Sequence, residues 1–184
     1  MKKNPVVVIG VSGSIAAHKA LDITSQLVKA GVSMHVVLTN DAAHFVKPLP
    51  FKTLSRNPVI TSLFDEDDWT PTHIALADEA DMLLIAPATA NTIAKLAVGI
   101  ADNALTCIAL ALNQKAKIVI APAMNGKMWL HPATQKNVET LKSRGVEFIG
   151  PEEGILSCGY EGIGRLMAVD KIVKLVLERL NLNQ

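Results

Sequence analysis

Two apolar runs of this chain end in the same way, with Ala-Pro-Ala followed by polar side chains. The first run leads into Thr89, Ala90, Asn91 and Thr92, and the second leads through Ala123 and Met124 into Asn125. Because proline ends strand pairing, these side chains should lie just beyond the strand ends, where small alanines let a ligand approach the backbone. One such segment could be an ordinary strand exit, but two in parallel predict a shared ligand site.

The first glycine-containing turn, GVSGSIA, suggests a phosphate site. It lacks the full G-x-G-x-x-G dinucleotide pattern, and Thr39 and Asn40 stand where an NAD site has an acidic residue. The hydroxyls of Ser12, Ser14 and Thr39 beside a helix N-terminus suit a terminal phosphate, which favours a mononucleotide such as FMN. The alternative is that Ser12 and Ser14 only cap the helix.

Two further side chains could take part in proton transfer. His73 follows an acidic segment, although a lone histidine is more often an ordinary surface or core residue. Cys158 lies among the closely spaced glycines of residues 154–164, which predict a mobile flap. This cysteine is either an accidental thiol or a proton donor to a trapped intermediate. The histidine and cysteine spacings support no zinc site.

The elements that would position these residues alternate between strands and helices. We expect strands at residues 5–10, 33–39, 81–88, 117–124 and 146–150, and helices at 12–31, 41–55, 91–112, 132–143 and 169–180. This alternation predicts an α/β fold, with one doubly wound Rossmann-like (flavodoxin-like) domain over residues 1–184. Its sheet would be mostly parallel, with helices on both faces and ligands at the carboxyl ends of the strands.

Composition narrows the classes of partner. The formal net charge is +1, which gives no basic footprint for nucleic acid, and the longest apolar stretch is interrupted by polar residues before it could span a membrane. The amino-terminal residues do not form a signal peptide. We therefore expect a cytoplasmic protein without nucleic-acid or membrane partners. The hydrophobic content of 49% is high enough that some apolar surface could lie at subunit contacts.

The segment PAMNGKMW, residues 122–129, fits the P-x-M-N-x-x-M-W signature of the flavin-containing cysteine decarboxylases. The chain also resembles this family in GVSGSIAAHK, THIALADEAD, APATANTIAKLAVGIADNALT and SCGYEGIGR, in the same order. The resemblance therefore extends over nearly the whole chain. One departure is Leu166, which separates Arg165 from Met167 where the family often reads G-x-G-R-M.

The resemblance implies a role for each matching residue. Asn125 would bind the substrate carboxylate with Met128 nearby, His73 would be the active-site histidine, and Cys158 would be the flap proton donor. FMN would be bound by Gly13, Ser14, Ile15, Thr39, Thr89, Ala90, Asn91, Thr92 and Ala123.

The resemblance also implies an activity. Within the family the chain is most similar to the coenzyme A biosynthetic member, a carboxy-lyase that converts 4′-phosphopantothenoylcysteine into 4′-phosphopantetheine. That reaction uses FMN and passes through a transient thioaldehyde and an enethiol. Family members assemble as homotrimers, or as dodecamers built from trimers, with FMN between subunits, and a separate synthetase that makes the substrate is a possible partner.

Other activities remain open. A peptidyl-cysteine decarboxylase stops at the oxidised enethiol and does not need a flap thiol, so Cys158 favours the coenzyme A reaction. An FMN-binding regulatory subunit of the same family would bind the cofactor without turnover. A flavin prenyltransferase shares the fold and the FMN site but lacks P-x-M-N-x-x-M-W.

Overall fold

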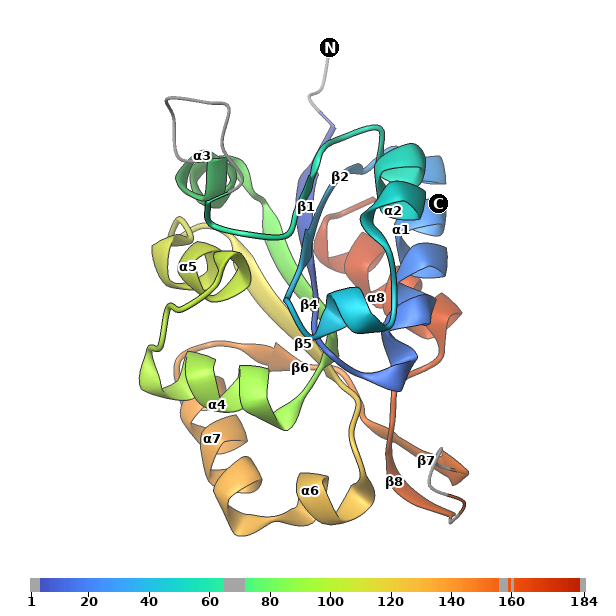
Figure 1. Cartoon of the computed structure of the whole chain (residues 1–184), viewed down its shortest axis with the longest axis vertical. Coiled ribbons are helices and arrows are strands. Elements are labelled where there is room, and N and C mark those ends of the chain that lie inside the picture. The colour runs from blue at the N-terminus through green and yellow to red at the C-terminus, as the bar shows by residue number, and fades with distance from the viewer. Residues whose placement is uncertain (1–3, 65–71, 156–158, 160, 183–184) are drawn as a thin grey trace.

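The structure, a computed structural model, describes residues 4–64, 72–155, 159 and 161–182. Over these residues, six parallel strands form one sheet in the order β3-β2-β1-β4-β5-β6 (Figure 1). They are β1 Val6–Val11, β2 Ser33–Leu38, β3 Val59–Ile60, β4 Met82–Ala88, β5 Lys117–Pro122 and β6 Glu147–Phe148. This is the Rossmann order, whose direction reverses between β1 and β4. The expected doubly wound α/β class is confirmed.

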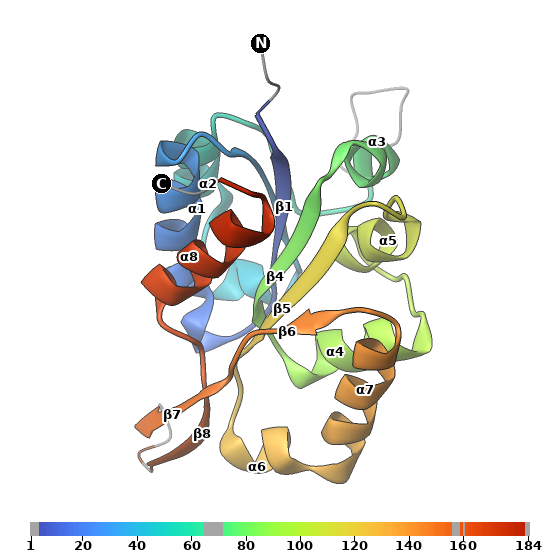
Figure 2. The ribbon, with the colours of Figure 1, turned by 180° about the vertical axis from the view of Figure 1, so that it is seen from behind.

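Helices cover both faces of the sheet, as Figures 1 and 2 show from opposite sides. One face carries α1 Lys19–Lys29, α2 Pro48–Ser55 and α8 Val169–Arg179. The other carries α3 Thr72–Glu79, α4 Ala90–Val98, α5 Ala104–Ala111 and α7 Pro132–Ser143. The short helices η1 Ile15–His18, η2 Ala42–His44 and α6 Gly126–Leu130 follow the carboxyl ends of β1, β2 and β5.

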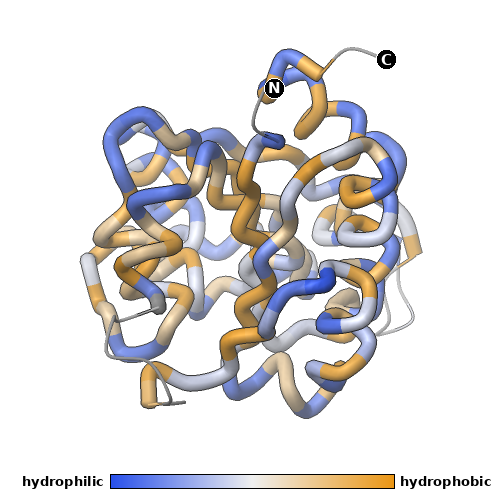
Figure 3. Tube along the Cα trace, turned by 90° about the horizontal axis from the view of Figure 1, so that it is seen from above, coloured by the Kyte–Doolittle hydropathy of each residue, from blue (hydrophilic) through white to orange (hydrophobic). Residues whose placement is uncertain are grey.

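The central strand β1 explains why the sheet is buried on both sides. All of its residues are buried, and Val7 and Ile9 face the cluster that includes α1 and α8, whereas Val8 faces the opposite cluster. Alternate side chains of a strand point to opposite faces, so a continuous β-branched run serves both cores. Seen from above, hydrophobic residues run along the central sheet, and hydrophilic residues lie mostly on the outer turns (Figure 3).

Several elements differ from the predicted ones, and three of these differences concern the segments beside the sheet edge. The helix expected over 91–112 is two helices, because Gly99 ends α4 in the left-handed conformation at φ 78° and Asn103 caps α5. The helix expected over 41–55 is η2 followed by α2, which begins at Pro48. The glycine-rich segment contains an antiparallel hairpin of β7 Glu152–Ile155 and β8 Glu161–Arg165, which sequence periodicity did not predict.

None of the helices in the described ranges combines the length and apolar character needed to cross a membrane.

Candidate functional site

The carboxyl ends of β1 and β4 are fastened together at the point where the strand order reverses. Ser12 is 1% exposed; its Oγ donates to the carbonyl of Pro87 at 2.8 Å and accepts from the backbone N–H of Thr89 at 2.9 Å. Its hydroxyl therefore does not cap a helix, contrary to one of the two interpretations of this residue, and the phosphate contact stays a prediction. Ser12 instead holds the first turn against the start of α4.

The two Ala-Pro-Ala segments lie side by side. The backbone N–H of Ala123 donates to the carbonyl of Ala88 at 3.0 Å, so the paths that leave β4 and β5 remain adjacent after the strands end. Thr89, Ala123 and Asn125 all line one pocket. The structure thus brings the two segments to the same edge of the sheet, as their shared pattern predicts.

This pocket has a volume of about 430 Å³, within the range of small-molecule sites. Gly13 forms part of its wall, and a Cβ at this position would overlap the Cβ of Asp41. The turn therefore needs glycine because the segment after β2 packs directly against it. The lining residues are Gly13, Ser14, Ile15, Ala16, His18, Lys19, Thr89, Ala123, Met124, Asn125, Met128, Ile155, Gly164, Arg165 and Leu166.

A smaller polar recess of about 150 Å³ shares Gly13 with the pocket. We call it the polar recess; its lining residues are Gly13, Thr39, Asn40, Asp41, Asn91, Thr92, Lys95, Asp102 and Asn103. The pocket and the recess together contain every residue to which the resemblance assigns FMN except Ala90, which begins α4 between Thr89 and Asn91.

The hydroxyls near these cavities also shape the backbone. Ser14 Oγ accepts from Ala16 N at 3.3 Å and caps η1, while Thr89 Oγ1 accepts from Thr92 N at 3.3 Å and caps α4. Capping is therefore correct for Ser14. A hydroxyl oxygen has two acceptor positions and one donor, so a cap does not exclude a ligand contact.

Asn125 begins the short helix α6 at the pocket wall. Its Oδ1 accepts from Lys127 N at 2.9 Å, which fixes the direction of the side chain. Met128, which is 50% exposed, lies one turn further along and also lines the pocket. Asn125, which the resemblance assigns to the substrate carboxylate, and its expected neighbour Met128 thus lie on one wall of the pocket.

The hairpin β7–β8 closes another side of the pocket. Met124 N donates to the carbonyl of Gly164 at 3.0 Å, and a Cβ on Gly164 would overlap the carbonyl oxygen of Met124. Glu152 Oε1 accepts from Lys171 Nζ at 2.7 Å, and Oε2 accepts from Arg165 at 3.3 Å. The hydrogen bond from Lys171 is the main reason that the pKa of Glu152 lies below its usual value.

The charges that line the pocket favour an anionic ligand. His18, Lys19 and Arg165 contribute basic groups, and the lining within the described residues contains no carboxylate. Sequence reasoning did not select His18 or Lys19. Their only signal was their place one turn after the glycine turn, where the first helix starts, and nothing in the pattern separated them from ordinary surface residues.

His73, one of the two residues expected to transfer protons, is not brought to this pocket within the chain. His73 is half-buried on α3, which packs against α5 near the end of the sheet where β1 and β4 begin (Figure 1). It lines neither the pocket nor the polar recess. Cys158 lies outside the described residues, and in the part of the chain that is described no cluster of side chains could hold a metal ion.

Two known proteins match about 95% of this chain. The chain is 46% identical over 175 residues to "Probable phosphopantothenoylcysteine decarboxylase" of Streptococcus mutans, which covers 95% of this chain and 98% of that protein. It is 49% identical over 176 residues to "Coenzyme A biosynthesis bifunctional protein CoaBC" of Bacillus subtilis. That match covers 95% of this chain but only 43% of the bifunctional protein, so the chain spans less than half of its length.

Solved structures agree in fold. A "PPC decarboxylase" cysteine-to-serine mutant, complexed with pantothenoylaminoethenethiol, superposes with a TM-score of 0.87 at 30% identity, over 97% of this chain and 99% of that one. The "FMN-dependent Cysteine Decarboxylases SpaF" structure superposes with a TM-score of 0.82 at 32% identity. The match covers 97% of this chain and 98% of that one. The flavoprotein family model matches residues 1–181. This chain therefore belongs to the flavoprotein family.

Proposed function

We propose that this protein is an FMN-dependent carboxy-lyase that converts 4′-phosphopantothenoylcysteine into 4′-phosphopantetheine in coenzyme A biosynthesis. The observation that carries the proposal is the 46% identity to the Streptococcus mutans protein, which extends over almost the full length of both chains. The basic lining of the pocket supports it as well, because this substrate carries both a phosphate and a carboxylate.

The residues present fit FMN. Gly13 lets the turn pack closely against Asp41, and the pocket and the polar recess that meet at Gly13 offer an apolar wall next to a polar end. Gly13, Ser14, Ile15, Thr39, Ala123 and residues 89–92 would hold the cofactor. When bound, FMN supplies a reversible two-electron acceptor, which lets the substrate pass through a thioaldehyde that can take up the electrons left by departing carbon dioxide.

Asn125 would hold the carboxylate that leaves. Its position as the cap of α6 orients the amide before substrate arrives, so little side-chain freedom is lost on binding. Met128 would exclude water from the reacting end, because its exposed side chain lies on the same wall.

Cys158 would protonate the enethiol that remains after decarboxylation. A related cysteine-to-serine mutant was solved with pantothenoylaminoethenethiol, and accumulation of an enethiol is what loss of such a proton donor predicts. Cys158→Ser should therefore release carbon dioxide but accumulate the oxidised enethiol. Normal product from this variant would show that Cys158 is not the donor.

His73 would act in the pocket of a neighbouring copy of this chain, in a homotrimer or a dodecamer of trimers. His73 does not line the pocket of its own chain, which supports this arrangement. Exposed apolar side chains that a second copy could cover include Val98 at 68%, Leu110 at 62% and Leu49 at 70%.

The test is turnover of matched substrates. FMN-loaded protein would be incubated separately with 4′-phosphopantothenoylcysteine and with a peptide that ends in cysteine, and the products would be identified by mass spectrometry. We expect 4′-phosphopantetheine from the first and little reaction with the second. An oxidised peptide enethiol would instead indicate a peptidyl-cysteine decarboxylase, and tight FMN binding without product from either would indicate a regulatory subunit.

A further inference from the structure

The polar recess beside the pocket is lined, among the described residues, by three charged side chains. Asp41 and Asp102 both line it, and Lys95 is the one lysine or arginine among its described lining residues. The recess meets the pocket at Gly13. A ligand in the pocket could therefore place a small polar end next to these charges.

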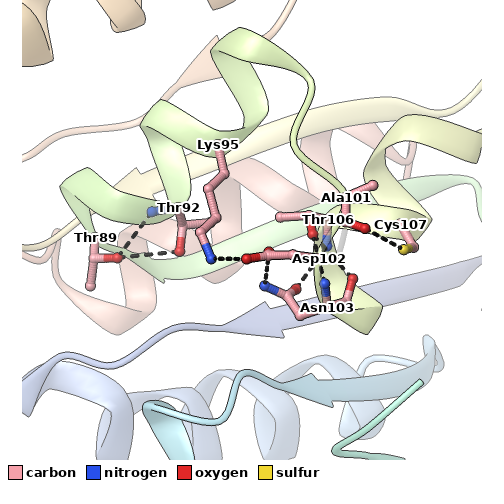
Figure 4. Close-up of polar contacts among 8 residues, drawn as sticks. All are labelled: Thr89, Thr92, Lys95, Ala101, Asp102, Asn103, Thr106 and Cys107. Atoms are coloured by element: carbon pink, nitrogen blue, oxygen red, sulfur yellow. Dashed lines mark hydrogen bonds and ion pairs between the residues drawn. The ribbon is translucent and has the colours of Figure 1, made fainter. Parts of the chain in front are cut away.

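Lys95 is held in position by a chain of contacts that joins α4 to α5 (Figure 4). Its Nζ donates to Asp102 Oδ2 at 2.6 Å, and Asn103 Nδ2 donates to Asp102 Oδ1 at 3.1 Å. Asn103 Oδ1 in turn accepts from Thr106 N at 3.0 Å, as the cap of α5. The lysine is thus directed across the gap between the two helices, with its side chain only 23% exposed.

The sequence places Lys95 on the ligand face of α4. Asn91 and Thr92 are four and three residues earlier on the same helix, so all three side chains lie on one side, and all three line the recess. The amino end of α4 adds a partial positive charge at the same place. A phosphate in the recess would therefore meet a helix end, polar side chains and one ammonium group, beside the carboxylates of Asp41 and Asp102.

The charges that line the polar recess indicate what Lys95 contributes to ligand binding. Without it, the recess would present two carboxylates and no cationic side chain among its described lining residues, which would repel a phosphate dianion. A neutral hydroxyl at the same place would be almost indifferent to that change. Loss of Lys95 should therefore weaken the binding of an anionic end group and leave the binding of a neutral one nearly unchanged.

We propose that Lys95, positioned by Asp102, is the residue by which this protein selects FMN over riboflavin. The proposal rests on the proposed FMN site. It adds to that site a positively charged residue that the family resemblance did not assign. An ammonium group has three donors, so Lys95 can keep its bond to Asp102 while it donates to a phosphate. A purely structural role is a poor explanation, because the ion pair is partly exposed, with Lys95 at 23% and Asp102 at 50%, and such pairs contribute little to stability.

Binding of the two flavins to the cofactor-free protein tests this inference. FMN and riboflavin would be titrated against wild type, Lys95→Gln, Lys95→Arg and the control Lys115→Gln by flavin fluorescence. Lys115 is exposed and precedes β5, at the opposite end of that strand from the site. We expect Lys95→Gln to weaken FMN binding about 10- to 100-fold, the range for a lost hydrogen bond between charged groups, with riboflavin affinity nearly unchanged.

Lys95→Arg should keep most of the selectivity, because it keeps the charge, and Lys115→Gln should keep all of it. Thermal unfolding of each variant would confirm that it is folded. A wild-type ratio of FMN to riboflavin affinity in Lys95→Gln would overturn this inference alone, as would loss of selectivity in Lys95→Arg equal to that in Lys95→Gln. If wild-type protein bound neither flavin, both this inference and the proposed function would be wrong.

Discussion

Replacing Gly164 by alanine tests how the hairpin β7–β8 is attached to the pocket. Gly164 has φ 134°, a backbone conformation that residues with a side chain rarely adopt. A Cβ added to Gly164 would lie under 3.0 Å from the carbonyl oxygen of Met124. It would also lie 3.2 Å from the backbone nitrogen of Gly126. Because these are backbone atoms, no side-chain rotation can relieve the contact. Either the two segments separate or both backbones shift.

The expected cost follows from these two effects. The unfavourable backbone conformation costs about 1–3 kcal/mol, and overpacking adds a further ~1–3 kcal/mol if the hairpin stays in place. Release of the hairpin loses the 3.0 Å hydrogen bond from Met124 to Gly164 and its local packing. That bond contributes only about 0.5–1.5 kcal/mol, so local release is the easier response. We expect the pocket wall to open while the parallel sheet remains folded.

Gly145→Ala is the matched control. Gly145 also has a positive φ, of 87°, but a Cβ there would meet nothing within 4 Å, so it isolates the conformational cost. We expect the free energy of unfolding in urea to fall by about 1–2 kcal/mol in both variants. Only Gly164→Ala should also show greatly faster hydrogen exchange at Met124 and weaker FMN binding. Unchanged exchange and FMN affinity in Gly164→Ala would refute the packing argument.

Four other substitutions have defined outcomes. The pKa of Glu152 is lowered chiefly by Lys171, so this interaction stabilises the fold above the unfolded glutamate pKa of about 4.3 and is lost as pH falls through the lower folded value. Glu152→Gln should cost about 0.5–1 kcal/mol at pH 7 and nothing near pH 2 in urea unfolding, and a difference independent of pH would contradict this. Asn103→Ala removes the cap of α5 and should cost about 1 kcal/mol, so an unchanged urea midpoint would argue against the capping role. His73→Asn and Asn125→Asp should each be inactive alone but regain part of the activity after subunit exchange, and no recovery would count against a shared site.

The fold class follows from the sequence because its strongest signals are local. The fully buried run of β1 and the proline-containing ends of β4 and β5 each carry their own strand pattern. The break between α4 and α5 was missed because residues 91–112 are apolar enough to continue a helix. Only Gly99 and the cap at Asn103 mark the break, and both are weak signals without structure.

The site was predictable where one strand end supplies several residues, as with residues 89–92. It was not predictable where a side chain enters from a distant element. Arg165 reaches the pocket through the hairpin, and Lys95 reaches the polar recess through its bond to Asp102. The proposed role of His73 would depend on packing between copies, which periodicity within one chain does not encode.

Turnover of a labelled substrate tests the central claim most directly. Purified FMN-loaded protein would be given 4′-phosphopantothenoylcysteine that carries carbon-13 in its carboxylate, without any other electron acceptor. The account predicts labelled carbon dioxide and 4′-phosphopantetheine in equal amounts over many turnovers, because the cofactor returns the electrons it takes. Absence of labelled carbon dioxide from fully loaded protein would contradict the account.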